Sequence, residues 1–181
     1  KGMRYYIYIL LIIFPFTSFS QSSVNSSNKC SAIFFIMTSI QKEEPALGEY
    51  FTKQGQMSQM LTGLYLSETT TETITNGMVS DIKSEEIKNY GKRYPSEKST
   101  IQRELENCMG WTYQIGLIVE DNLAILSNEK KLKTLLLNSP RPYEVYDYPF
   151  EDKSWMNDII IGSFDTWISN GSITPNSMKD L

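Results

Sequence analysis

Acidic side chains are the groups in this sequence best able to do chemistry, because it contains 21 Asp and Glu residues and no histidine. Two carboxylates held roughly 5 to 10 Å apart in a cleft can hydrolyse a glycosidic bond by general acid and base catalysis. The first candidates for such a pair are Glu104, Glu106, Glu120 and Asp121. Acids more often lie on a solvated helix face. A carboxylate-dependent hydrolase acting on cell-wall or other polysaccharide is therefore the alternative hypothesis.

The absence of histidine from the sequence excludes several other kinds of catalysis. Ser-His-Asp and Cys-His mechanisms need an imidazole in their usual forms. Two cysteines without histidine cannot supply the four nitrogen and sulfur ligands of a conventional zinc site. The sequence also contains no glycine-rich phosphate loop of standard spacing and no EF-hand loop. We therefore expect no metal and no cofactor, and we favour a protein that is not an enzyme.

A tract rich in proline and tyrosine offers a candidate binding surface. It contains one arginine and four aromatic residues: Arg141, Tyr143, Tyr146, Tyr148 and Phe150. Such a combination can hold a peptide or a sugar ring. The more common outcome is that the aromatic rings are buried against the helices as the linker crosses them. Both interpretations remain open at this point.

Residues 3–20 have the pattern of a cleavable signal peptide. Arg4 supplies positive charge, and Ile7–Phe16 is an apolar run. Ser18 and Ser20 then place small residues where a signal peptidase reads them, which predicts cleavage after Ser20. The protein is thus expected in the periplasm or outside the cell. An uncleaved membrane anchor is the alternative, although a span needs about 20 predominantly apolar residues and this run is shorter.

The two cysteines are best explained as a disulfide. An exported protein enters an oxidising compartment, where a pair of cysteines favours a Cys30–Cys108 bond over free thiols. Closing a loop of 79 residues stabilises a fold by roughly 4 to 4.5 kcal/mol in the chain-entropy model.

The charge balance argues against a nucleic-acid partner. Without Lys1 and Arg4, the remaining 161 residues carry 15 basic and 21 acidic side chains, a net charge of −6. Phosphate contacts require a basic face. The sequence after residue 20 also contains no other run long enough for a stable membrane span.

Apolar residues recur at helical spacing along most of the chain. The ranges expected to form helices are Lys29–Gln41, Pro45–Ser67, Ser96–Val119, Ser127–Asn138 and Asp152–Asn170, with Gly171 ending the last one. In the third of these, Ile101, Leu105, Cys108, Thr112, Ile115 and Val119 share one face. Residues 69–94 fit a helix capped by Thr71, but Asn76-Gly77 is also a hairpin signal; we favour the helix.

Three glycines, Gly48, Gly55 and Gly63, lie along one flank of the helix expected over Pro45–Ser67. They could permit close approach of a partner helix. We favour the simpler interpretation that glycine is tolerated there at some cost in helix propensity.

These segments predict an all-α fold, a bundle of five or six helices tied by one disulfide. Residues 1–20 form the signal peptide, 21–28 a flexible Ser/Asn-rich leader, and 29–181 a single helical domain. Within that domain, 29–126 form the core of the bundle. The range 127–181 adds C-terminal helices joined by the Pro/Tyr-rich linker.

The short sequence Cys108–Trp111, a Cys-x-Gly-aromatic pattern at a buried helix, loosely resembles small exported, disulfide-bonded helical immunity proteins that neutralise type VI secretion effectors in the periplasm. The likeness covers four residues, so it suggests a class and assigns no functional residue. The favoured function is a non-catalytic exported helical protein that binds another protein as an inhibitor or assembly factor. This function predicts an exposed apolar or aromatic patch.

Overall fold

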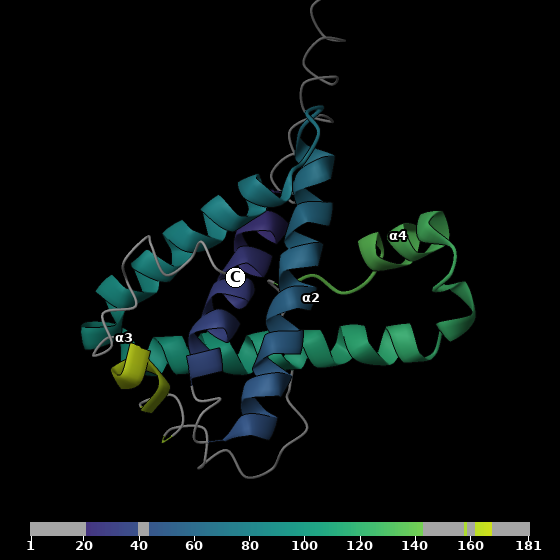
Figure 1. Cartoon of the computed structure of the whole chain (residues 1–181). Coiled ribbons are helices and arrows are strands. Elements are labelled where there is room, and N and C mark those ends of the chain that lie inside the picture. Colours follow the sequence, from purple (N-terminus) through teal and green to yellow (C-terminus); the bar gives the residue numbers. More distant parts are fainter. Residues whose placement is uncertain (1–20, 40–43, 143–157, 159–161, 168–181) are drawn as a thin grey trace, which may run out of the picture.

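The computed structural model describes residues 21–39, 44–142, 158 and 162–167, and this part of the chain contains helices and no strand. The helical elements are residues 21–37, α2 (Pro45–Thr69), α3 (Asn76–Glu120), the 3-10 turn η2 (Leu123–Ile125), α4 (Glu129–Leu137) and residues 162–167 (Figure 1). The prediction of an all-α fold is confirmed.

The first helix, residues 21–37, lies antiparallel beside α2 (Figure 1). Two contacts fix this pairing. The Thr62 hydroxyl donates to the Ser27 hydroxyl at 2.9 Å, and a Cβ placed on Gly55 would lie 3.4 Å from the Cβ of Phe34. Gly63 similarly faces a methyl group of Val79 at 3.4 Å. A Cβ could make contacts of this length, so they do not require glycine at either position, and tolerated glycine stays the favoured interpretation.

Helix α3 bends at Pro95 into two arms, residues 76–96 and 98–120 (Figure 1). Proline has no N–H to donate and its ring clashes with the carbonyl four residues earlier. Glu97 accordingly leaves helical geometry, with φ −123° and ψ 28°. The Ser96 hydroxyl donates back to the Arg93 carbonyl at 3.3 Å, on the other side of the bend from the second arm.

The Cys30–Cys108 disulfide joins the first helix to the second arm of α3, as predicted, with the two Cα atoms 5.3 Å apart. The first helix also contacts the other arm, because the Asn28 side-chain amide donates to the Ile82 carbonyl at 2.9 Å. The face expected to be buried in the second arm is confirmed: Ile101, Leu105, Cys108, Thr112 and Ile115 are all buried, and Val119 packs against the core. The first helix is therefore the element around which both arms pack.

The predicted flexible leader, residues 21–28, is wrong, because this segment is helical. Its Ser and Asn content favours coil in isolation. In the fold, however, Val24 is 4% exposed and Ser27 is fully buried. The Ser27 hydroxyl donates to the Val24 carbonyl at 3.1 Å and accepts from Thr62. Tertiary burial has overridden local composition here.

The stretch predicted as helix over 69–94 is helical only from Asn76. Thr75, and not Thr71, caps it, since the Thr75 hydroxyl accepts from the Met78 N–H at 3.3 Å. Asn76-Gly77 forms the first turn of α3 and no hairpin.

Several predictions lie outside the described residues. These are the signal peptide over residues 1–20, four aromatic residues of the tract, namely Tyr143, Tyr146, Tyr148 and Phe150, and the stop at Gly171. Of the helix expected over Asp152–Asn170, residues 162–167 are described and are helical. Within the described ranges, no helix combines the length and apolar character needed to cross a bilayer.

Candidate functional site

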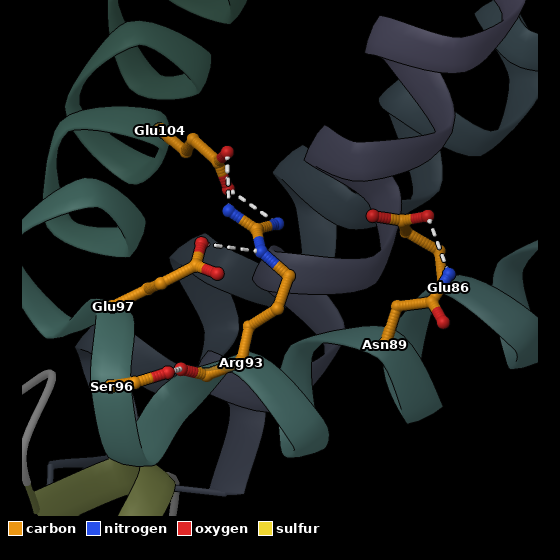
Figure 2. A network of polar contacts seen from close by, with 6 residues as sticks. All are labelled: Glu86, Asn89, Arg93, Ser96, Glu97 and Glu104. Carbon is orange, nitrogen blue, oxygen red and sulfur yellow. Dashed lines mark hydrogen bonds and ion pairs between the residues drawn. The ribbon is translucent and has the colours of Figure 1, made fainter.

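Glu104, the first of the predicted catalytic acids, is bound to an arginine across the α3 bend (Figure 2). The Arg93 guanidinium donates to both carboxylate oxygens of Glu104, at 2.8 and 3.3 Å, and to Glu97 at 2.8 Å. The hydrogen bonds that Arg93 donates to Glu104, and then to Glu97, raise the pKa of Arg93. A carboxylate held in this way links the two arms of α3 and is engaged by a permanent cation.

The other predicted acids do not gather around Glu104. Glu106 accepts from the Gln102 amide at 3.2 Å one helical turn away, and Glu120 and Asp121 are exposed at the end of α3. None of the four acids lines the three hollows described below. The same part of the chain holds no group of three or more His, Cys, Asp and Glu residues suited to a metal ion.

Arg141 is the one residue of the predicted binding tract that the structure describes, and it packs inward. Its guanidinium lies over the Tyr65 ring at 4.6 Å and donates to the Leu137 carbonyl. Nearby, the Trp111 indole donates to the Pro140 carbonyl at 2.9 Å. Arg141 therefore helps to attach the chain after α4 to the bundle. The interpretation that the aromatic rings of the tract are buried against the helices stays a prediction.

A cluster of aromatic rings covers the α3 bend. The ring of Tyr94 stacks on Phe164 with centroids 4.5 Å apart, and Trp167 meets Phe164 edge-on. The Tyr94 hydroxyl donates to the Asp165 carboxylate at 3.2 Å. Burial, and then this carboxylate, raise the pKa of Tyr94 to about 12. Residues 162–167 thus close the core at the bend.

A hollow of about 680 Å³, which we call the Lys83 groove, opens between the first helix, α2 and the first arm of α3. Polar residues and apolar residues share its lining: Gln56, Gln59, Asn76, Ser80 and Lys83 with Phe35, Met60, Ile74 and Val79. A smaller hollow of about 320 Å³ adjoins it and shares Phe35, Gln56, Gln59 and Lys83. Such volumes are typical of small-molecule sites.

Lys83 is the one charged side chain in the lining of both hollows. Its ammonium donates to the Gln59 side-chain oxygen at 2.8 Å and lies 5.2 Å from the Phe35 ring centre. Burial lowers the pKa of Lys83. No carboxylate of the described residues pairs with it, unlike Lys53, Lys88 and Arg93.

Exposed apolar side chains are concentrated in the sequence near the end of α3 and in the turn that follows it. Of the five large apolar or aromatic residues that are exposed in the described part of the chain, four are Tyr113, Leu117, Leu123 and Leu126. We call these four residues the α3 tip. The second arm of α3 runs beyond α2 before the chain turns into η2 and α4 (Figure 1). Next to the tip, a hollow of about 580 Å³ is lined by Ile125, Leu135, Lys130, Lys131, Thr134 and Asn138.

Neither the Lys83 groove nor the α3 tip was anticipated from the sequence. The groove combines residues from three elements that are separated by up to 48 positions, and no motif links them. Spacing does offer a signal for the tip: Tyr113 and Leu117 are four residues apart on the face of α3 opposite the buried one.

Comparisons with protein-family models, with curated proteins and with solved structures found no match for this chain.

Proposed function

We propose that this chain is an exported, non-catalytic helical protein that binds another protein through the α3 tip, as an inhibitor or an assembly factor. The observation that carries the proposal is the concentration of exposed apolar side chains between Tyr113 and Leu126. Contiguous apolar patches of several hundred Å² on a protein surface mark interaction sites, and these four exposed side chains are the candidates for such a patch among the described residues. Leu123 is 61% exposed and Leu126 41%, so both are available to a partner.

Charge next to the tip suggests the character of the partner. The chain as a whole carries a net charge of −4, yet α4 holds Lys130, Lys131 and Lys133 against a single acid, Glu129. Apolar residues beside a local basic group suit a partner that presents apolar side chains with acidic neighbours, because complementary charge speeds association and selects partners.

Export is supported by the disulfide. A Cys30–Cys108 bond forms and persists in an oxidising compartment and is rare in a reducing one. Cleavage after Ser20 would keep the buried Ser23 and Val24 in the mature chain, so the packed first helix is compatible with removal of residues 1–20.

The test is affinity capture from the exported fraction of the host with wild-type protein and with the double variant Leu123→Glu/Leu126→Glu. We expect a specific partner with the wild type and loss of that partner with the variant, since two charges would have to be desolvated in the interface. Met60→Glu is the control, because it places one such charge on the exposed large apolar residue that the described part of the chain has outside the tip.

Recovery of no specific partner, or equal recovery by the double variant, would overturn the proposal. Intact mass of the captured protein tests export separately. A chain beginning at Gln21 and lighter by two hydrogens would establish both cleavage and the disulfide. A chain that retains residues 3–20 would indicate the membrane-anchored alternative.

A further inference from the structure

We propose that the Lys83 groove binds a small monocarboxylate with an apolar chain, the carboxylate pairing with Lys83 and the chain lying against Phe35, Met60 and Val79. This inference is independent of the protein-binding role proposed for the α3 tip. It is drawn from the charge, the lining and the volume of a hollow that the tip does not share.

The charge of the groove is the first argument. Lysine has three N–H donors, and Gln59 accepts from one of them while no other described residue accepts from the rest. The residues that line the two adjoining hollows include this one cation and no acid. A half-buried cation with no counter-charge attracts an anion more strongly than an exposed lysine does, because screening is weaker there.

Polar groups around Lys83 reinforce the preference for an anion. Asn76 and Ser80 line the groove from the first two turns of α3, where the positive end of the helix dipole favours negative charge. Ser31, which lines the adjoining hollow, is 2% exposed, and its hydroxyl has no hydrogen-bond partner among the described residues.

The apolar lining decides the class of anion. Phe35, Met60, Ile74 and Val79 provide hydrocarbon surface around the single charge. A phosphate or another dianion would leave charge against apolar walls, and such burial is unfavourable. A monocarboxylate matches the one ammonium group, and an attached alkyl chain gains free energy by covering the apolar residues.

The test is calorimetric titration of the disulfide-bonded protein with octanoate and with 1-octanol, which has the same chain and no charge. We expect saturable binding of octanoate and clearly weaker binding of octanol. Lys83→Gln should weaken octanoate binding about tenfold or more, the effect of losing one charged hydrogen bond. Lys83→Arg should retain most of it.

Lys92→Gln is the matched control, because Lys92 is an exposed lysine on the same arm of α3 and lines neither hollow. It should bind octanoate like the wild type, and so should Leu123→Glu/Leu126→Glu. The inference is overturned if octanoate does not saturate, if octanol binds equally well, or if Lys83→Gln binds octanoate as tightly as the wild type.

Discussion

Arg93 and Glu104 lie on opposite sides of the Pro95 bend, and the guanidinium of the first holds both carboxylate oxygens of the second (Figure 2). Each side chain is 24% exposed. The pair therefore sets the relation between the two arms of α3, a role that a residue on one straight helix could not have.

Removing the charge of this pair should destabilise the fold. Glu104→Gln keeps the shape of the side chain but loses the ionic part of a two-point hydrogen bond, so we expect the free energy of unfolding to fall by about 1 to 2 kcal/mol. Urea denaturation measures the free energy of unfolding of the wild type, of Glu104→Gln, of Arg93→Gln and of the double variant. The four values together give the coupling energy between the two side chains.

Glu49→Gln serves as the control for that experiment. Glu49 pairs with Lys53 at 2.7 Å, but both side chains are largely exposed, and such pairs contribute little. No measurable loss is expected. If Glu104→Gln behaves like Glu49→Gln, the Arg93 contact does not stabilise the bend.

The phenol of Tyr94 should stay neutral far into the alkaline range. Its pKa in the fold is about 12, against about 10 for an unfolded chain. Its contribution to stability is therefore fully present below about pH 10 and is lost as the pH rises from 10 through 12. The difference in tyrosinate absorbance between the wild type and Tyr94→Phe should show a midpoint near 12. A midpoint near 10 would contradict the burial of this hydroxyl at the bend.

Loss of the disulfide should have the largest effect of the changes considered. The Cys30→Ala/Cys108→Ala variant releases a link between residues 78 positions apart. We expect the free energy of unfolding to fall by about 4 kcal/mol, because the unfolded chain has more conformational entropy without the crosslink. Equilibrium unfolding in guanidinium provides the measurement, with the slope fitted separately for each protein because the unfolded chain without the crosslink exposes more surface. A change of a few tenths of a kcal/mol would show that the link is dispensable.

Gly116→Ala should stabilise α3. Gly116 is exposed in the second arm, and an added Cβ would meet nothing within 4 Å. Alanine in a helix interior is better than glycine by up to about 1 kcal/mol. Thermal unfolding should show the rise. Gly55→Ala provides the contrast, because its Cβ would touch the Cβ of Phe34 at 3.4 Å and should gain less.

Local periodicity predicted the helices and the face that each buries. The spacing of Ile101, Leu105 and Cys108 placed Cys108 on the buried face of the second arm, while the Cys30–Cys108 bond itself was predicted from an oxidising compartment and a pair of cysteines. Residues three and four positions apart lie on the same face of a helix, so the buried face of each helix can be identified from the local sequence alone.

Relations between elements were beyond such reasoning. The Ser27 hydroxyl is buried and accepts from Thr62, which lies 35 residues later in the chain. The local Ser/Asn composition contains no information about that partner and therefore indicated a flexible leader. Similarly, Arg93 was given no role because the residue that it binds, Glu104, is brought close only by the Pro95 bend. The Lys83 groove is formed where the first helix, α2 and α3 pack against one another. The periodicity within each helix does not predict how the three helices pack.

Closure of the core by residues 162–167 has a consequence for biosynthesis. Tyr94 contacts Asp165, 71 residues later in the chain. At about 5 to 20 residues per second, the ribosome releases Tyr94 several seconds before it releases that partner. During this interval the aromatic side chains at the bend remain uncovered. Chaperones that bind exposed aromatic segments therefore have a window in which to engage the nascent chain.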